Sequence, residues 1–401
     1  MQKYEKILSA IKGETPLFKM IELGFHPNEI KEAIIESFSP YFENKDVLEK
    51  LAIEILVPES INILRLQKNK GFFMFFEKCL SAYRLAKLKD SKSCFESCAI
   101  WKSQIIQSLS EFWSVLYLEV DKNTLEIEEF VHECFRNIGD LTEGLIKPYL
   151  KVLLHQIKIG DGIKTSVENI NSLDLGQMVN KLIQNGYTDL LMPAPWNIRL
   201  NQWRNIAYHH SAKIVDNKIV CWYGIPPNIK TVQLFRNELL QIVDTISNIL
   251  KPLKLAYTLF FIDHAQEIEK YLISDETEIR EESEFICFAS GLASQGFEIV
   301  EYKKSSEEAK LTVKDLSDMN PNERKIHASQ FLFPLWDMTR SKRMVVEYRE
   351  KDNTPNLLAS ADSTICEKIY NGELELSALA KTFEWVDLKK KKIVPPALDN
   401  E

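Results

Sequence analysis

The residue types that could do chemistry gather in one short segment of the sequence, residues 203–210, which reads WRNIAYHH. Histidine titrates near neutral pH and can accept or donate a proton, while the planar guanidinium of arginine can balance charge that grows on phosphoryl oxygens. Cleavage of a phosphodiester by the neighbouring ribose 2′-hydroxyl needs both kinds of help and no metal. Arg204 and His209 therefore predict a metal-independent RNA-cleaving site that uses no cofactor.

Helix geometry constrains how these side chains could meet. Asn205 and His209 are four residues apart and share a helix face, so Asn205 is expected to orient the imidazole or to contact the phosphate. Arg204 and His209 are five residues apart and lie about 140° apart around an ideal helix. They converge on one phosphate if the helix frays at His209, or if a second protomer brings its own copies. The second alternative predicts a homodimer with a composite active site.

The surroundings of this segment carry a family resemblance. RNIAYH at 204–209 resembles the Rx4–6H motif of the HEPN superfamily, in its R-N-x-x-x-H form. The preceding helix LGQMVNKLIQNG, the following hairpin AKIVDNKIVCWY and a closing helix are also similar to that family, over about residues 126–250. The resemblance implies a helical-bundle endoribonuclease of phage defence, toxin or stress systems. Such an enzyme acts on RNA as a dimer and leaves 2′,3′-cyclic phosphate ends, with a regulatory protein or a nucleotide as its trigger.

The resemblance also assigns roles to residues. It implies that Arg204 and His209 are catalytic and that Asn205 supports them. It further implies an acidic residue on an earlier helix near the motif arginine. Our candidate for that residue is Glu143, and its rivals are Glu133 and Asp140.

Other readings of the same residues remain open. Tyr208 and His210 are candidate substrate contacts, although packing roles would suit both. Arg204 could pair with Glu143 and cap carbonyl groups, while a cationic His209 at a helix C-terminus would be favoured by the helix dipole. Some HEPN relatives are non-catalytic, so a nucleotide- or protein-binding module is the alternative function. A regulatory subunit that engages a partner through its lysine run at 389–392 is a further alternative to a solvated tail there.

One position departs from a toxin subgroup of the same family. In that subgroup a tyrosine follows two residues after the motif histidine and is the target of nucleotidylation. Ser211 stands at this position here. That form of regulation is therefore not expected.

The elements that must position the segment are predicted to be mainly α-helical. Only 13 glycines and 15 prolines interrupt 401 residues, which favours long helices over a fold with many turns. We predict a helical N-terminal region over 1–120, a HEPN-like bundle with a short β-hairpin over 121–258, and a small α+β domain over 259–401. Apolar periodicity predicts helices at 126–157 with a bend at Pro148, 175–184, 197–209, 231–250, 322–336 and 374–385. Strands are predicted at 212–215, 219–222, 297–302, 311–313 and 344–348.

Composition bounds the remaining possibilities. The net charge of −8 argues against a protein that coats nucleic acid along its whole surface, but leaves room for a local basic cleft. The first residues lack the apolar core of a signal peptide, and the longest apolar runs are too short to span a bilayer, so we expect a cytoplasmic protein with no membrane partner. Cys94, Cys98, His132 and Cys134 are the only conceivable metal cluster, yet their spacing suits half-buried core residues better than zinc.

Overall fold

The computed structural model describes residues 23–116, 125–272 and 281–376, together with residues 4, 5, 8, 20, 379, 384–387 and 392–393. The chain divides into two compact units. The helical unit comprises Tyr41–Leu48 and Glu59–Ile279, and the mixed unit comprises Met1–Pro40, Glu49–Pro58 and Arg280–Glu401. The three sequence ranges proposed above stay a prediction, although one helix, Arg236–Asp263, runs across their boundary at residue 258.

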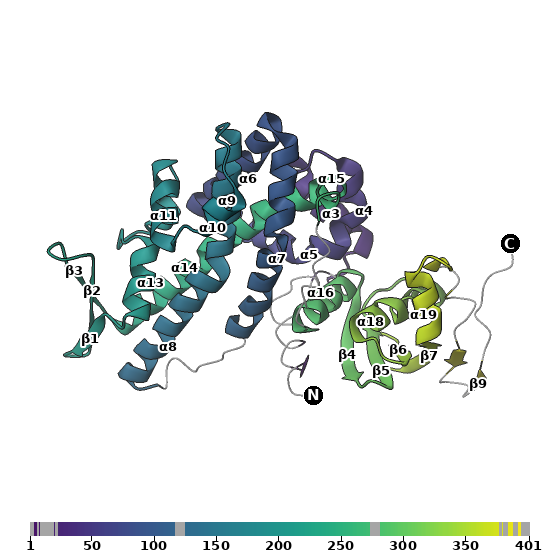
Figure 1. The fold of residues 1–401 in the computed structure, drawn as a ribbon. Helices are drawn as coiled ribbons and strands as arrows, with labels where there is room; N and C mark the ends of the chain where they lie inside the picture. The colour runs from purple at the N-terminus through teal and green to yellow at the C-terminus, as the bar shows by residue number, and fades with distance from the viewer. Residues whose placement is uncertain are drawn as a thin grey trace. The chain divides into compact units, whose positions relative to one another are not determined.

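The chain is mainly helical with a smaller sheet toward its C-terminus, as predicted (Figure 1). Its N-terminal helices are α3 (Pro27–Phe38), α4 (Lys45–Ile55), α5 (Val57–Gln67), α6 (Lys70–Lys89) and α7 (Ser91–Leu116), with a 3-10 turn, η1 (Ser39–Tyr41), after α3. Within the helical unit, α6, α7 and α9 (Lys147–Gly160) pack against one another, and α14 (Arg236–Asp263) packs along α6. Large buried side chains, among them Tyr83, Trp101 and Tyr149, fill the space between these helices. None of the helices within the described residues combines the length and apolar character needed to cross a bilayer.

The long helix predicted over 126–157 is present as three consecutive segments. Between α8 (Ile127–Gly139) and α9 lies a π-helical segment, η2 (Asp140–Ile146), which the sequence did not predict. Pro148 has no N–H, and its ring would clash with the carbonyl four residues earlier, so the widened turn just before it avoids a regular α-helical ladder. The Thr142 hydroxyl donates to the carbonyl oxygens of Ile138 and Gly139, at 2.7 and 3.1 Å. The irregularity predicted at Pro148 therefore lies ahead of that residue.

The predicted helix over 175–184 is confirmed as α11 (Leu175–Gln184). A capping box begins it, because the Asp174 carboxylate accepts the N–H of Gln177 and the Gln177 side chain accepts the N–H of Asp174. The motif helix α13 (Leu200–Tyr208) is shorter at both ends than the predicted 197–209. The short helices α10 (Val167–Asn171), α12 (Thr188–Leu191) and α15 (Ala265–Glu269) complete the helical unit.

The hairpin after α13 is confirmed and gains a third strand. β1 (Ala212–Val215) and β2 (Lys218–Tyr223) pair through a turn in which Asp216 and Asn217 have φ of 49° and 60°. β3 (Lys230–Leu234) pairs with β2, so the prediction of a helix from residue 231 was wrong for its first turn, and α14 begins at Arg236. The alternation of exposed Gln233 with half-buried Val232 and buried Leu234 suits a strand whose one face is covered.

The mixed unit has a sheet with strand order β4-β5-β6-β7-β8-β9. β5 and β6 are parallel, and every other neighbouring pair is antiparallel. Its elements are α16 (Glu281–Ser294), β4 (Phe297–Lys304), β5 (Glu308–Asp315), α17 (Pro321–Ser329), α18 (Leu332–Thr339), β6 (Arg343–Arg349), β7 (Pro355–Asp362), α19 (Ser363–Tyr370), β8 (Glu384–Asp387) and β9 (Lys392–Ile393).

The three strands predicted in this region are confirmed as parts of β4, β5 and β6, whereas β7 was not predicted. The single helix predicted over 322–336 is the pair α17 and α18. Residues 384 and 385, predicted as the end of a helix, lie in β8, because pairing with β7 determines their conformation. Of the lysine run 389–392, only Lys392, in β9, lies among the described residues.

Candidate active site

The motif helix ends directly before its two histidines. Tyr208 is the last residue of α13, and His209 caps it with φ −92° and ψ 5°. The N–H of Ser211 donates to the Ile206 carbonyl at 3.0 Å, and the N–H of His210 donates to the Ala207 carbonyl at 3.4 Å. These two bonds form a Schellman motif, in which His210, with φ 46°, takes the left-handed position that glycine usually fills. The backbone thus turns sharply here and exposes both imidazoles.

The motif arginine lies against the π-helical segment. Arg204 forms an ion pair with Glu143, which also accepts a hydrogen bond from Lys147 Nζ at 2.7 Å. A second guanidinium nitrogen of Arg204 donates to Asn205 Oδ1 at 3.1 Å. The predicted pairing of Arg204 with Glu143 is therefore present, and it fixes the plane of the guanidinium.

One donor of the Arg204 guanidinium has no hydrogen-bond partner among the described residues. This donor, Nε, is buried, although the side chain as a whole is 24% exposed. Because Nε is buried, an added anion cannot reach it directly. The Glu143 carboxylate anchors the guanidinium from one side, and the exposed edge of the group is the part that an added anion can reach.

Tyr208 covers the start of the π-helical segment. A Cβ placed on Gly139 would come within 3.3 Å of the Tyr208 ring, so this glycine lets the ring approach the backbone of α8 closely. The Arg204 guanidinium carbon lies 5.7 Å from the centre of the same ring. Burial, followed by the negative charges of Glu143 and Asp140, raises the pKa of the Tyr208 hydroxyl, so this group stays a neutral hydrogen-bond donor. The residue as a whole is nevertheless 52% exposed, which leaves it accessible to a ligand.

Asn205 and His209 are not joined as the spacing suggested. Asn205 is occupied by Arg204, and no hydrogen bond links it to the His209 imidazole among the described residues. No hydrogen bond joins the side chains of Arg204 and His209 within the same set. The N–H of His209 still donates to the Asn205 carbonyl at 3.0 Å, so the last helical turn includes this residue and the chain departs from the helix at His210. Both alternatives raised by the spacing, fraying at His209 and a second protomer, stay predictions.

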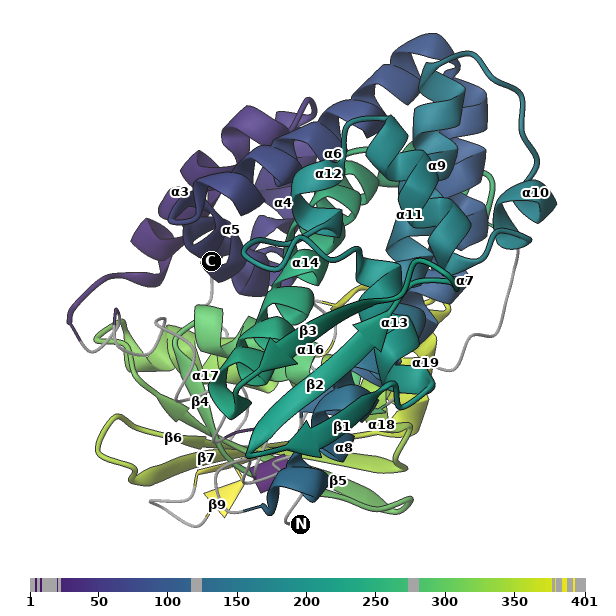
Figure 2. The ribbon, with the colours of Figure 1, turned by 90° about the vertical axis from the view of Figure 1, so that its left-hand side faces the viewer.

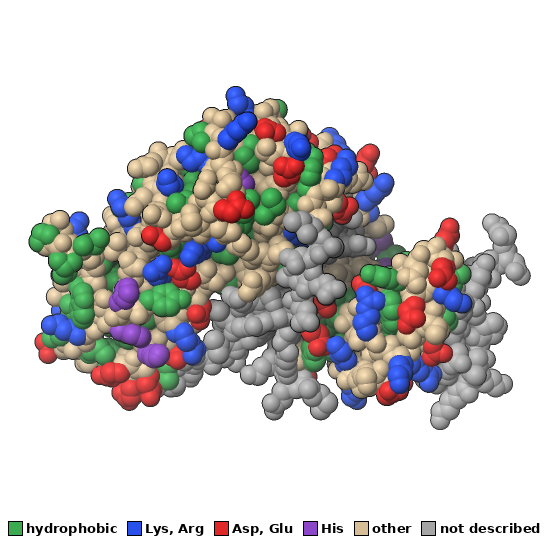
Figure 3. All heavy atoms as spheres, viewed as in Figure 1, with side chains coloured by type: hydrophobic (Ala, Val, Ile, Leu, Met, Phe, Trp, Pro, Cys, Tyr) green, Lys and Arg blue, Asp and Glu red, His purple; other side chains and the backbone are tan. Residues whose placement is uncertain are grey.

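A third histidine, which sequence reasoning did not connect with the site, faces the helix end from α8. The rings of His132 and His210 lie 5.8 Å apart, at 78° to one another. Figure 3 shows histidine side chains gathered on the face over α8 and α13. His132 entered the sequence reasoning only as a metal ligand, because nothing in its spacing relates it to residue 210.

The two rival carboxylates have other surroundings. Glu133 pairs with Arg136 on its own helix at 2.5 Å. Burial raises the pKa of the Asp140 carboxyl, and Arg136 partly offsets this. Neither forms an ion pair with Arg204 among the described residues, which leaves Glu143 as the carboxylate that holds it.

Cations continue from the site along α9. Lys147 and Lys151 are four residues apart and share a helix face with Glu143, a spacing from which the sequence could have singled them out. Lys151 Nζ donates to Asn171 Oδ1 at 2.7 Å, and burial followed by repulsion from Lys147 lowers its pKa. Together with Arg204, these side chains form a local basic strip on a chain whose net charge is negative.

The cysteines considered as metal ligands are core residues. Cys94, Cys98 and Cys134 are buried, and His132 lies on the exposed side of α8. Within the described part of the chain, no group of three or more histidine, cysteine, aspartate or glutamate side chains is arranged to hold a metal ion.

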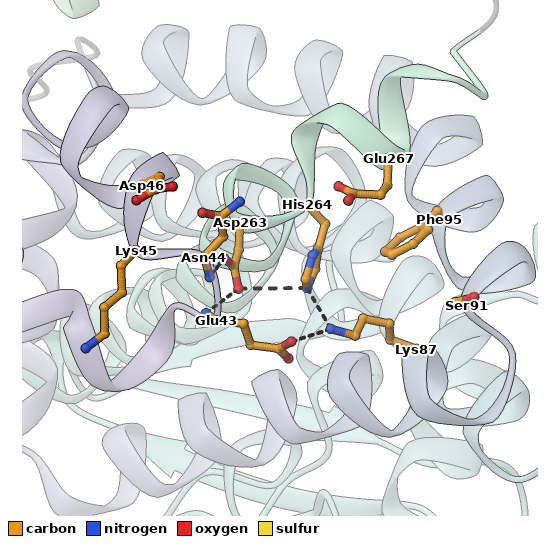
Figure 4. A pocket seen from close by; sticks show the side chains of 10 residues that line it. All are labelled: Glu43, Asn44, Lys45, Asp46, Lys87, Ser91, Phe95, Asp263, His264 and Glu267. Carbon is orange, nitrogen blue, oxygen red and sulfur yellow. Dashed lines mark hydrogen bonds and ion pairs between the residues drawn. The ribbon is translucent and has the colours of Figure 1, made fainter.

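A second polar cluster lies in a pocket of the helical unit at the C-terminal end of α14 (Figure 4). The buried Asp263 carboxylate accepts the backbone N–H groups of Glu43 and Asn44, each at 2.8 Å, just before α4 begins. Lys87 pairs with Glu43 and lies 3.5 Å from His264 Nε2. Burial and the nearby Lys87 charge lower the pKa of His264, so its neutral imidazole can accept from this lysine. The polar groups of this cluster bond to one another, as expected of a structural cluster that holds the end of α14 against the start of α4.

The first cluster, by contrast, combines what phosphodiester chemistry requires. An arginine is fixed at one side by Glu143, exposed imidazoles stand at the end of the same helix, and two lysines extend the positive charge. Comparison with family models, with curated proteins and with solved structures gave no match to this chain.

Proposed function

We propose that this chain is a metal-independent endoribonuclease of HEPN type, with its active site at the C-terminal end of α13. The observation that carries the proposal is the carboxylate-anchored Arg204 on the same short helix that ends in the exposed His209. The Arg204 side chain is 24% exposed, so an incoming phosphate can approach the solvent-facing edge of the anchored guanidinium. Histidine supplies the proton transfer that attack by a 2′-hydroxyl needs.

In this proposal each residue has a distinct role. His209 takes the proton from the ribose 2′-hydroxyl as its oxygen attacks the adjacent phosphorus. The bond to the 5′-oxygen breaks, leaving a 2′,3′-cyclic phosphate and a 5′-hydroxyl that gains a proton. Arg204 stabilises the additional negative charge on the phosphoryl oxygens. Glu143 and Asn205 are positioning residues, since both act through Arg204.

A proton donor is needed for the leaving 5′-oxygen, and we propose a second imidazole, for which three sources are available. His210 follows His209 directly, and His132 lies against His210 from α8. A homodimer that brings a second His209 across its seam is the other arrangement, and it forms part of the proposal for a composite site. A role in phage defence, as a toxin or in a stress response, under a protein or nucleotide trigger, belongs to the same proposal.

The test is cleavage of RNA in EDTA by the wild-type chain beside Arg204→Ala and His209→Ala. We expect each variant to lose at least about 100-fold of the wild-type rate, the usual effect of removing one group that stabilises developing charge. The products should carry 2′,3′-cyclic phosphate ends, which resist polyadenylation until the cyclic phosphate is removed.

A matched control is available at the other end of the same helix. Arg199 directly precedes α13 and its guanidinium donates to Asn180 Oδ1 at 2.7 Å, so Arg199→Ala removes a guanidinium outside the proposed site. It should keep the wild-type rate. Equal cleavage by all four chains would identify a contaminating nuclease, and no cleavage by a folded wild-type chain under triggering conditions would favour the nucleotide- or protein-binding module.

A further inference from the structure

The sheet that follows the motif helix presents a surface that the proposed chemistry does not use. Its covered side carries Ile219, Cys221 and Leu234, which are buried. The opposite side, here called the outer face, is formed by alternate strand residues Lys213, Val215, Lys218, Val220, Trp222, Thr231 and Gln233. Figure 2 shows the three strands side by side at the front of the helical unit.

Two aromatic rings are exposed at opposite ends of this surface. Trp222 is 36% exposed, and Phe235, which directly follows β3, is 55% exposed. Lys218 Nζ lies 5.6 Å from the centre of the Phe235 ring. Because Lys218 and Trp222 are four residues apart along β2, the two ring positions are separated by about 14 Å. Aromatic surface left open on a strand is available to planar ligands.

The charge on the outer face has one sign. Its strand positions include two lysines, Lys213 and Lys218, and no carboxylate. Exposed rings flanked by lysines on an open surface fit an unpaired nucleic acid strand, whose bases stack on the rings while its phosphates meet the cations. In a duplex the faces of the bases are already stacked on one another, so they are not available to stack on these rings.

The outer face is joined by the backbone to the end of α13. β1 begins two residues after His210, and the N–H of Trp222 donates to the carbonyl oxygen of Ser211 at 3.0 Å. The strand position of Trp222 is therefore fixed directly beside the residue that follows the two histidines. A strand lying on the outer face would arrive at the helix end that carries His209.

We propose that the outer face of the β1–β3 sheet binds single-stranded RNA and delivers it to the α13 site, with Trp222 as the stacking residue and Lys213 and Lys218 as phosphate contacts. This inference rests on the proposed function for the identity of the nucleic acid. It adds a substrate class, because it requires unpaired bases next to the cleaved bond.

The test measures binding separately from cleavage. The full chain carrying Arg204→Ala, which should not cleave, is titrated into a fluorescein-labelled 12-nucleotide oligouridylate in EDTA, and anisotropy reports the affinity. Adding Trp222→Ala should weaken binding about 5- to 20-fold, whereas Trp222→Phe should retain most of it. Replacing Lys213 and Lys218 together by alanine should lower the slope of log affinity against log salt by about 1.4.

Matched controls separate these effects from general ones. Lys68→Ala with Lys70→Ala removes two exposed lysines elsewhere in the helical unit and should leave the salt slope unchanged. Binding of a 12-base-pair RNA duplex should not respond to Trp222→Ala. The proposal is overturned if Trp222→Ala leaves the affinity for oligouridylate unchanged, or if Trp222→Phe weakens that affinity as much as Trp222→Ala does.

Failure of this inference and failure of the proposed function give different results. If RNA cleavage depends on Arg204 but RNA binding does not depend on Trp222, the proposed nuclease activity is supported and the proposed role of the sheet is rejected. If RNA binding depends on Trp222 but no cleavage occurs under any condition, the role of the sheet is supported and the nuclease activity is rejected. Loss of a dimer in Trp222→Ala by sedimentation, with RNA affinity unchanged, assigns the outer face to a second copy of the chain and also overturns the proposal.

Discussion

Each unit of the molecule contains an arginine that is ion-paired with a carboxylate, together with a histidine on or directly after the same helix, and the two units use these residue types differently. In the mixed unit, Arg324 donates from two nitrogens to Asp315, both at 3.0 Å, and to the Gln295 carbonyl at 2.8 Å. Its side chain is only 2% exposed. In the helical unit, Arg204 is 24% exposed and leaves its buried Nε without a partner among the described residues.

The histidines differ in the same way. His327 lies between Arg324 and Gln295, with ring nitrogens 3.3 and 2.5 Å from their polar atoms. His209 and His210 are exposed at a helix end. A cluster whose polar groups all bond to one another stabilises the fold. A cluster with a partly exposed guanidinium and exposed imidazoles still has polar groups that can bind a ligand. The comparison therefore distinguishes a structural arginine from a candidate for chemistry without reference to function.

The sharpest way to break this comparison is to remove each arginine and measure stability. Arg324→Ala leaves the buried Asp315 charge without its ion-pair partner and should lower the free energy of unfolding by about 3–5 kcal/mol. Arg204→Ala should cost about 1 kcal/mol or less, because Glu143 is partly exposed and still paired with Lys147. Urea unfolding followed by circular dichroism measures both.

An exposed ion pair provides the reference. Lys351 pairs with Asp318 at 2.8 Å on the surface of the mixed unit, so Lys351→Ala should change stability by no more than about 1 kcal/mol. If Arg204→Ala were as destabilising as Arg324→Ala, the structural reading of the motif arginine would hold, and the proposed site would lose its main support.

The sequence predicted the parts of this fold and site that depend on local patterns. α11 was predicted correctly because apolar residues recur on one face of it, where Leu175, Met178, Val179 and Leu182 are buried, and because Gly186 follows its end. The family resemblance predicted an acidic residue near Arg204, with Glu143 as the candidate, and a structural role for Arg204 predicted the same pairing; the ion pair is present and suits both. Local spacing and a recognisable motif were sufficient for these features.

The features that were missed depend on residues distant in sequence or on weak local preferences. β3 owes its conformation to pairing with β2, so Lys230–Leu234 gave no strong strand signal of its own. The contact of His132 with His210 joins two elements whose separation carries no periodicity. The Arg324–Asp315 pair joins a helix to the end of a strand, and periodicity does not report such contacts.

A second measurement sharpens the comparison through pH. Burial, followed by repulsion from Arg324, lowers the pKa of His327 from its ordinary 6.5 to about 4. Between these two pH values the unfolded chain therefore binds more protons than the folded chain. The contribution of the neutral His327 ring to the free energy of unfolding is fully present above pH 6.5 and is lost as the pH falls toward 4. Because the ring is part-exposed, we discount the full shift and expect a loss of about 1–2 kcal/mol between pH 7.5 and pH 4.

His327→Gln is the variant that isolates this contribution. It removes the titrating ring, so its stability should fall less steeply than that of the wild-type chain across the same pH window. Parallel slopes for wild type and His327→Gln would contradict the assignment of His327 to a neutral, internally bonded state.

The smallest expected effect concerns the left-handed residue at the end of α13. His210 has φ 46°, where a side chain is strained and glycine is not, so His210→Gly should leave the free energy of unfolding unchanged or raise it by up to about 1 kcal/mol.

The same change removes an imidazole that faces His132, and we expect RNA cleavage to fall if this pair protonates the leaving oxygen. Asn353, with φ 70° in the mixed unit, is the matched position, and Asn353→Gly should leave cleavage as it is. A gain in stability together with a loss of cleavage would mean that the chain keeps a strained histidine for its chemistry. Full cleavage by His210→Gly would make His210 a packing residue and leave His132 or a second His209 to supply the proton.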